Sequence, residues 1–185
     1  MLISEDYRQQ SKALHAARLD YGANGHILAP DVVRIAKIVQ ARSILDYGAG
    51  KQTLREELGH LGFTGDVHAY DPAVSGIDDR PEPADLVACI DVLEHVEPEC
   101  LEAVLWDLHE LARRALYVSI HLGPAHKTLP DGRNAHLTQR PAEWWLERLF
   151  HRFTFETAGA DRQHLGAHLT PRPDRIVALP TGWPG

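Results

Sequence analysis

The feature that most constrains the fold of this chain is an alternation of short apolar segments with longer amphipathic ones. Four apolar segments are predicted strands: SILDY (43–47), DVHAY (66–70), DLVACI (85–90) and ALYVSIH (115–121). Residues 53–62 and 98–114 lie between them and carry apolar side chains at helical spacing. Strands that alternate with helices of this length form a mostly parallel sheet with helices on both faces. We therefore predict an α/β fold with a doubly wound sheet.

The flanking segments extend this pattern at both ends. Residues 5–18 predict a mostly polar helix, and Pro30 with Asp31 opens a clearly amphipathic one that ends near Ala41. After His121 comes a loop of about 18 residues, which is long for a compact domain without a function. A helix and two strand-like stretches follow, and these strands are expected to form an antiparallel C-terminal edge: 140–150, 152–159 and 174–180.

The length of 185 residues suits a single domain. We divide it into an N-terminal helix and cap at 1–30, a cofactor-binding core at 31–122, and an acceptor-side region at 123–185 with the loop, the helix and the edge strands. A homodimer that supplies further pocket walls is one possible assembly of so short a chain.

Charge and composition exclude several classes of protein. Nineteen basic against 26 acidic residues give a net charge of −7, so general nucleic-acid binding is not expected. No apolar run approaches the roughly 20 residues of a membrane span, and the N-terminus has no basic-then-apolar leader. Cys89 and Cys100 are too few for a disulfide framework, so we expect a cytoplasmic location.

A glycine turn between the first core strand and the next helix is the most informative motif. The strand brings Asp46 to Gly48-Ala49-Gly50, and glycines let a ligand approach the backbone beside a helix N-terminus. The second strand ends in Asp71, which is placed to bind both ribose hydroxyls of a nucleoside. Thr53 stands where a dinucleotide-binding G-x-G-x-x-G pattern has its third glycine, which disfavours a nicotinamide oxidoreductase.

Three segments together, ILDYGAG, VHAYDP and ADLVACIDVLEHV, resemble the class I S-adenosylmethionine-dependent methyltransferases over residues 31–122. Gln52 departs from the family's usual third glycine. Through this resemblance each family role falls on a residue of this chain. Asp46, Gly48 and Gly50 are expected to bind the methionine end of the cofactor, and Asp71 with Pro72 to bind its ribose. Asp91 and Val92 are expected to lie beside the sulfonium. The segment with Tyr21, which precedes the core, is expected to cover the cofactor.

The resemblance implies transfer of a methyl group from S-adenosylmethionine to oxygen or nitrogen of a small-molecule or nucleotide-like acceptor, with S-adenosylhomocysteine as product. Enzymes that methylate amino groups of adenine or cytosine commonly have an Asn/Asp-Pro-Pro-aromatic loop, where this chain has IDVLEH. Enzymes acting at C5 of a pyrimidine need a cysteine nucleophile, whereas Cys89 and Cys100 are both expected in the core. Both classes are therefore disfavoured.

Three histidines are the candidates for acid–base catalysis. His121 ends the fourth core strand, at the edge where sheets of this type bind ligands, and is the leading candidate for a general base. His95 follows the preceding strand, and His136 lies in the long loop on the acceptor side.

The spacing Asp91-x-x-Glu94-His95 leaves metal binding open. Ligands at i, i+3 and i+4 share one side of a helical turn, and His121 or His136 would complete the set. This spacing resembles small-RNA 2′-O-methyltransferases and the metal-dependent O-methyltransferases of quinone biosynthesis, although similar strings occur in class I enzymes that use no metal. Two alternatives accordingly accompany the main prediction: a non-catalytic S-adenosylmethionine-binding partner protein and a metal-dependent RNA terminal 2′-O-methyltransferase.

Overall fold

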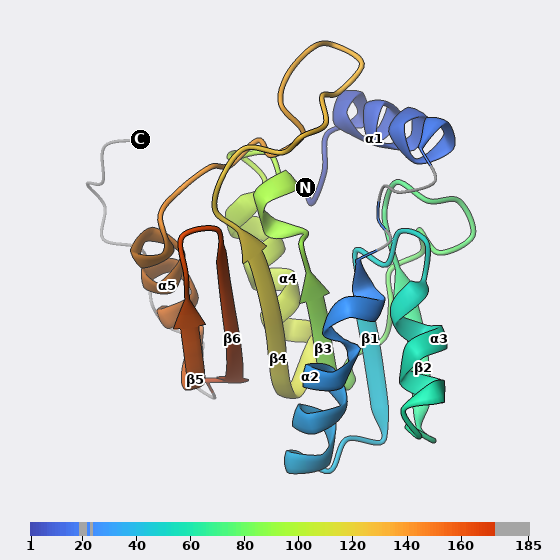
Figure 1. Cartoon of the computed structure of the whole chain (residues 1–185), viewed down its shortest axis with the longest axis vertical. Helices are drawn as coiled ribbons and strands as arrows, with labels where there is room; N and C mark the ends of the chain where they lie inside the picture. Colours follow the sequence, from blue (N-terminus) through green and yellow to red (C-terminus); the bar gives the residue numbers. More distant parts are fainter. Residues whose placement is uncertain (19–21, 23, 173–185) are drawn as a thin grey trace.

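A computed structural model describes residues 1–18, 22 and 24–172 of the chain (Figure 1). Within these residues the chain forms helices and strands in the order α1 (Glu5–Ala17), α2 (Gly25–Ile38), β1 (Ser43–Tyr47), α3 (Thr53–His60), β2 (Asp66–Tyr70), β3 (Ala84–Ile90), η1 (Leu93–His95), α4 (Leu101–Leu111), β4 (Ala112–His121), α5 (Ala142–Phe150), β5 (Phe153–Ala160) and β6 (His164–Pro171).

The strands form one six-stranded sheet in the order β2-β1-β3-β4-β6-β5. The pairs β1–β2, β1–β3 and β3–β4 are parallel, whereas β6 is antiparallel to both of its neighbours. This confirms the predicted α/β fold, with its mostly parallel sheet and antiparallel C-terminal strand. Because β1 connects to β2 on one side and pairs with β3 on the other, the strand order reverses at β1, and sheets of this type bind ligands at the carboxyl end of such a point.

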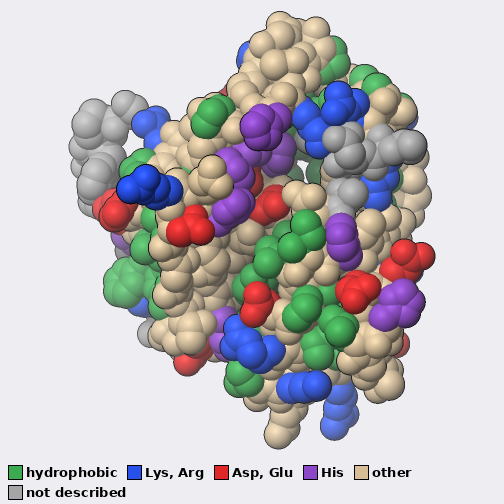
Figure 2. All heavy atoms as spheres, in the orientation of Figure 1, with side chains coloured by type: hydrophobic (Ala, Val, Ile, Leu, Met, Phe, Trp, Pro, Cys, Tyr) green, Lys and Arg blue, Asp and Glu red, His purple; other side chains and the backbone are tan. Residues whose placement is uncertain are grey.

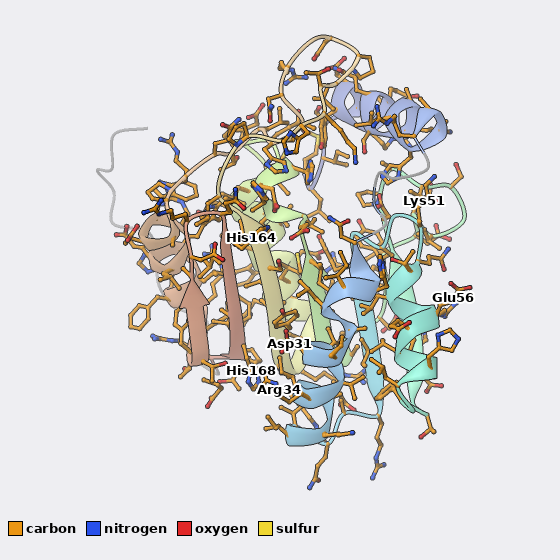
Figure 3. The ribbon with its side chains drawn as sticks, in the orientation of Figure 1. Asp31, Arg34, Lys51, Glu56, His164 and His168 are labelled. Carbon is orange, nitrogen blue, oxygen red and sulfur yellow. The ribbon has the colours of Figure 1, made fainter. Side chains whose placement is uncertain are left out.

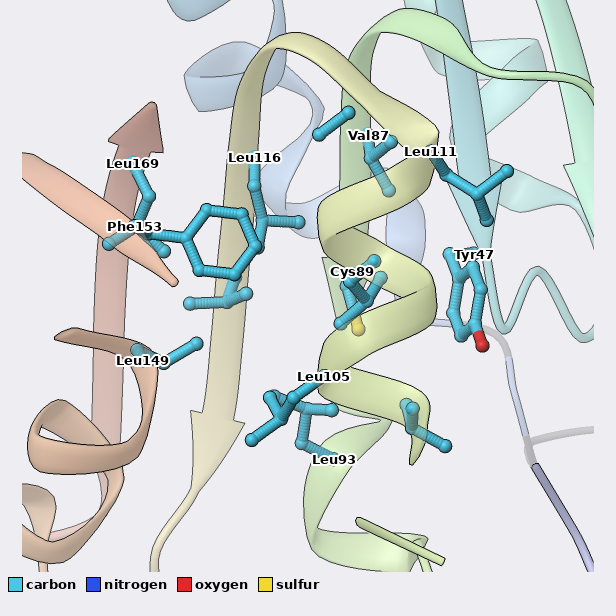
Figure 4. Close-up of a cluster of buried hydrophobic side chains, with 14 of the residues drawn as sticks. Tyr47, Val87, Cys89, Leu93, Leu105, Leu111, Leu116, Leu149, Phe153 and Leu169 are labelled. Carbon is cyan, nitrogen blue, oxygen red and sulfur yellow. The ribbon is translucent and has the colours of Figure 1, made fainter. Parts of the chain in front are cut away.

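Helices cover both faces of the sheet, as the alternating pattern predicts. On one face, α4 and α5 pack over a core that includes Leu105, Trp145 and Phe153, part of which Figure 4 shows. On the other face, α2 and α3 contribute Val32 and Leu54 to a second core. Strand β3 is buried along almost its whole length because it is covered from both sides. This burial explains its continuous apolar sequence.

Helix α1 lies across the carboxyl edge of the sheet, beside the long loop between β4 and α5 (Figure 1). The Ser4 side chain accepts a hydrogen bond from the Tyr7 amide at 3.1 Å and so caps the helix. Tyr7 and Leu14 pack with Leu129 of the loop in a small apolar cluster. The N-terminal helix and the loop therefore form one cover over the sheet edge.

Helices α2 and α4 have other boundaries than the sequence predicts. Helix α2 begins at Gly25, ahead of Pro30, because a glycine there allows close contact: a Cβ on Gly25 would lie 2.9 Å from Cβ of Leu54. Helix α4 ends at Leu111, and the next residue, Ala112, already pairs with Ala84 of β3. Pairing with the neighbouring strand thus ends a helix that was expected to continue to 114.

The C-terminal hairpin differs from the prediction in one of its strands. Strand β5 matches the expected strand at 152–159, but its partner is β6 (His164–Pro171), which we did not predict as a strand. Alternate residues Leu165, Ala167 and Leu169 of β6 enter the core, while glycine and histidine between them weaken the strand pattern. The predicted strand at 174–180 lies outside the described residues. No helix in the described part of the chain is long and apolar enough to cross a membrane.

Candidate functional site

The glycine loop after β1 has a backbone that most side chains would disrupt. Gly48 and Gly50 have φ of +79° and +46°, in the left-handed region that favours glycine. A Cβ on Gly48 would overlap the Val92 side chain, and one on Gly50 would lie 2.7 Å from the Gly22 carbonyl oxygen. The amides of Gly48 and Ala49 donate to the Tyr70 carbonyl at 2.7 and 3.0 Å, which fixes the loop to the end of β2.

Gln52 occupies the position at which the resemblance leads one to expect a third glycine. Its φ is +59°, so this residue adopts the left-handed conformation that a glycine would adopt with less strain. The loop therefore keeps its shape despite the substitution. Helix α3 begins directly after it, at Thr53.

Two aspartates lie beside this loop with their carboxylates largely buried. Asp71 accepts hydrogen bonds from the Gly50 amide (3.1 Å) and the Ala73 amide (2.9 Å), one on each oxygen. His15 of α1 approaches it, with Nε2 3.9 Å from Oδ2. Burial, with a contribution from Asp71, raises the pKa of Asp46 to about 7.

The segment after β3 carries a second group of acids. Asp91 has φ of +53° and is held by three contacts: its amide donates to the Ser119 carbonyl, and its carboxylate accepts from the Ser119 hydroxyl (2.8 Å) and the Asn24 side-chain amide (3.2 Å). Glu94 is fully buried, and its Oε1 accepts from the His121 amide at 2.7 Å. Burial, followed by the nearby Asp91 carboxylate, raises the pKa of Glu94 to about 8.

Four histidines from different elements lie next to one another at this edge. The rings of His95 and His136 have centroids 4.7 Å apart, those of His136 and His121 5.0 Å, and those of His121 and His164 4.7 Å. Burial lowers the pKa of His95 to about 3 and also lowers the pKa of His136. Figure 3 labels His164 at the end of β6 that lies nearest the loop, and Figure 2 shows histidine side chains gathered on the same part of the surface.

The glycine loop, the acids and three of the four histidines, His95, His121 and His136, line a single cavity of about 290 Å³. Ten predicted site residues line this cavity: Asp46, Gly48, Asp71, Pro72, Asp91, Val92, Glu94, His95, His121 and His136. Gly50 lies just behind the lining, where its amide supports Asp71. Tyr21 lies outside the described residues. The chain thus brings together residues from the ends of four strands and from the long loop.

The cover contributes further lining residues that the sequence analysis did not identify. Tyr7, Ser11 and His15 of α1 face the cavity, and Glu97 lines it beside them. The Glu97 carboxylate accepts from the Ser4 amide at 2.8 Å and from the Ser4 hydroxyl at 2.6 Å. The periodicity of α1 shows only an apolar side, so nothing in the sequence pairs it with this cavity.

His164 was also missed, because the strand that carries it was not predicted. Its register opposite His121, at the end of the β4–β6 pair, brings the two rings together. Cys89 and Cys100 are buried free thiols, as expected for core residues, and neither lines the cavity.

Neither a protein-family model nor a curated protein matches the chain. Solved structures do resemble it. The 1,6-didemethyltoxoflavin-N1-methyltransferase of Burkholderia thailandensis, with bound S-adenosylhomocysteine, has a TM-score of 0.67 at 16% identity over 92% of this chain and 91% of that one. The N-methyltransferase NodS of Bradyrhizobium japonicum WM9 has a TM-score of 0.61 at 15% identity, over 91% and 100%.

The magnesium protoporphyrin IX methyltransferase of Synechocystis PCC 6803 has a TM-score of 0.59 at 18% identity, over 90% of this chain and 97% of that one. Identities this low establish the fold alone. The chain has the fold of the class I S-adenosylmethionine-dependent methyltransferases, and the resemblance drawn from its motifs is confirmed at that level.

Proposed function

We propose that this chain is an S-adenosylmethionine-dependent methyltransferase that transfers a methyl group to oxygen or nitrogen of a small-molecule or nucleotide-like acceptor. One observation carries the proposal: the glycine loop with Asp71 lines the same cavity as His95, His121 and His136. Such a cavity has a place for a nucleoside cofactor at one end and proton-accepting side chains at the other.

The residues at the glycine end fit this cofactor. Each Asp71 oxygen accepts one amide hydrogen and keeps a further lone pair, so the carboxylate can also accept from two ribose hydroxyls. Gly48 has no side chain to narrow the cavity there. S-adenosylmethionine carries a positive sulfonium, and the Asp91 carboxylate places negative charge on the same wall, as Asp46 does once it loses its proton near pH 7.

When bound, the cofactor supplies a methyl group activated by positively charged sulfur, and the sulfur keeps the bonding electron pair as the product forms. The chain's own task is to hold the acceptor in line with that methyl group and to exclude water. A histidine at the other end accepts the proton that the acceptor oxygen or nitrogen loses. His121, at the end of β4, is the candidate for this base, and the ring of His136 packs beside it.

The size of the cavity and the net charge of the protein favour a small acceptor. A cavity of about 290 Å³ is at the lower end for a ligand site. The net charge of −7 repels polyanions. An RNA terminus is therefore the less favoured acceptor.

Binding of the cofactor is tested by titration calorimetry and thermal shift with S-adenosylmethionine, S-adenosylhomocysteine and NAD. We expect both sulfur compounds to bind and NAD not to bind. Asp71→Asn should weaken their binding at least about tenfold, since it removes a charge-assisted ribose contact. Asp66→Asn, at the exposed start of the same strand, is the matched control and should bind as the original chain does. Absence of binding by either sulfur compound would overturn the proposal.

Transfer is tested by release of S-adenosylhomocysteine in a screen of small molecules, nucleotides and RNA fragments. Turnover with a small molecule or nucleotide supports the proposal. Turnover only with an RNA terminus, and only with added metal, would instead support the RNA 2′-O-methyltransferase. Cofactor binding without turnover by any acceptor of the screen would favour the non-catalytic binding protein.

A further inference from the structure

Glu94, His95 and His136 form a compact group on the wall of the cavity. One carboxylate oxygen of Glu94 and one ring nitrogen from each histidine all lie within 4.8 Å of one another. Glu94 and His95 belong to η1, and His136 comes from the loop between β4 and α5. Two segments far apart in the sequence thus place a carboxylate and two imidazoles around one point.

Within the described residues, only one of the two carboxylate oxygens of Glu94 has a hydrogen-bond partner. Its side chain is fully buried, and Oε1 accepts from the His121 amide. Among the described residues, however, no group donates a hydrogen bond to Oε2. A buried polar oxygen without a hydrogen-bond partner is costly and rare in folded proteins, whether or not it carries a proton. A cation bound at this point would supply the missing interaction.

Both histidines are held in the form that a metal ion requires. Nδ1 of His95 lies 2.8 Å from the Ala135 carbonyl oxygen, and Nδ1 of His136 lies 2.6 Å from the Gly123 carbonyl oxygen. Because a carbonyl only accepts, Nδ1 carries the proton in each ring and the lone pair is on Nε2. Histidines that bind metals typically donate their other ring hydrogen to a carbonyl or a carboxylate in this way.

We propose that Glu94, His95 and His136 bind a divalent transition-metal ion. Two imidazole nitrogens with one carboxylate oxygen suit Mn²⁺, Fe²⁺, Co²⁺ or Zn²⁺, whereas Mg²⁺ and Ca²⁺ prefer sites made wholly of oxygen. Bonds of about 2.1 Å keep the ligands of one ion within about 4.2 Å of each other. The group therefore needs only a small side-chain adjustment to close on an ion.

Three protein ligands leave coordination positions open toward the cavity. Water or an acceptor atom can fill these positions. Asp91 adds negative charge beside the group; its carboxylate is oriented by hydrogen bonds from Ser119 and Asn24 and lies outside the set of ligand atoms within 4.8 Å of one another. The proposal does not depend on methyl transfer, because the ion binds whether or not S-adenosylmethionine does.

The test uses the full chain, freed of metal with a chelator and then dialysed against Mn²⁺, Co²⁺, Zn²⁺ or Mg²⁺ without cofactor. Bound metal is measured by mass spectrometry, and the Co²⁺ complex by its visible absorption. We expect about one equivalent of a transition ion and no retained Mg²⁺. Glu94→Gln and His136→Ala should each weaken binding at least about tenfold.

The matched control is His60→Ala, which removes an imidazole that also lies beside a glutamate, Glu57, but on the exposed surface of α3. It should bind the ion as the original chain does. If Glu94→Gln fails to fold, His136→Ala and the Co²⁺ spectrum of the original chain decide the question. Absence of bound metal, or binding that survives both substitutions, would overturn the proposal. Asp71→Asn should lose cofactor binding yet retain the ion, so the two proposals can fail separately.

Discussion

The two ends of the cavity are built in different ways. The glycine end is shaped by backbone: positive φ at Gly48 and Gly50, and amides that donate to Tyr70 and Asp71. The histidine end is shaped by side chains that come from η1, β4 and the long loop, and His164 of β6 packs against His121 outside the lining. The first end is local in sequence, and the second is assembled only by the tertiary fold.

The two ends should therefore be damaged by different kinds of substitution. A backbone-built site fails when a side chain is added, because the added atoms overlap neighbours or force an unfavourable φ. A side-chain-built site fails when a functional group is removed, while the fold around it persists. Single substitutions at each end should show this division.

Removing imidazoles should affect transfer far more than cofactor binding. His121→Ala is expected to lower kcat by about 10²–10⁴-fold, which is typical of losing an acid–base group. The dissociation constant of S-adenosylhomocysteine should change less than about threefold, since the glycine end is untouched. Single-turnover kinetics with an acceptor from the screen, alongside calorimetry, measures both. Equal losses in binding and turnover would show that the two ends are not separable.

Adding a single methyl group at the glycine end should damage both stability and binding. Gly48→Ala places a Cβ against Val92 at a φ of +79°. Overpacking and strain together are expected to lower the free energy of unfolding by about 2–4 kcal/mol, measured by urea denaturation. Gly59→Ala, in α3 with no atom near its Cβ position, is the control and should instead raise stability by roughly 0.5–1 kcal/mol. Unchanged stability and cofactor binding in Gly48→Ala would show that the backbone of this loop does not shape the site.

Asp46 should make the protein less stable as pH rises. Its pKa is about 7 in the folded chain against an ordinary value of 3.8, so between these values the folded state binds the proton that the unfolded state has lost. The free energy of unfolding therefore falls as pH increases from about 4 to 7, by up to about 4 kcal/mol for this group. Asp46→Asn should flatten the pH dependence of urea denaturation, and Asp66→Asn should not. An unchanged slope in Asp46→Asn would contradict the assignment.

The smallest effect is expected where a side chain already occupies a glycine-like conformation. Gln52→Gly relieves a φ of +59° and should raise the free energy of unfolding by up to about 1 kcal/mol. Gln40→Gly relieves a φ of +53° outside the cavity and is the comparison. Both should stabilise the fold in denaturation, and only Gln52→Gly should alter cofactor affinity. Destabilisation by Gln52→Gly would mean that its side chain makes contacts worth more than the strain.

The glycine end was largely predictable from sequence, because its signals are local. A buried strand, a glycine turn and a helix predict the loop around Gly48, and Asp71 follows from the end of the next strand. The doubly wound sheet was predictable for the same reason. Gln52 shows the limit: its sequence suggests a change in the loop, whereas the backbone keeps the left-handed conformation.

The histidine end was predictable only in part. His95, His121 and His136 were identified by their places after strands and in the loop, and all three line the cavity. His164 was missed because glycine and histidine obscure β6, and its ring meets His121 only through antiparallel register. His15 and Glu97 were missed because they meet the cavity through docking of α1, which no local pattern encodes. Cytoplasmic location, dimerisation and the division of the chain into parts stay predictions.

The attachment of α1 has a consequence for kinetics. Helix α1 is attached to the rest of the chain by polar contacts, which include Ser4 with Glu97, Gln10 with Asp131, Asp6 with Arg133 and the His15 carbonyl with Lys51, and by the small apolar cluster with Leu129. Most of these polar contacts are exposed to solvent, whereas β3 is buried from both sides, so we expect release of the helix to cost less than global unfolding. Because α1 covers the cavity, we expect its opening to limit how fast a bound molecule leaves, and we expect the amide hydrogens of α1 to exchange faster than those of β3.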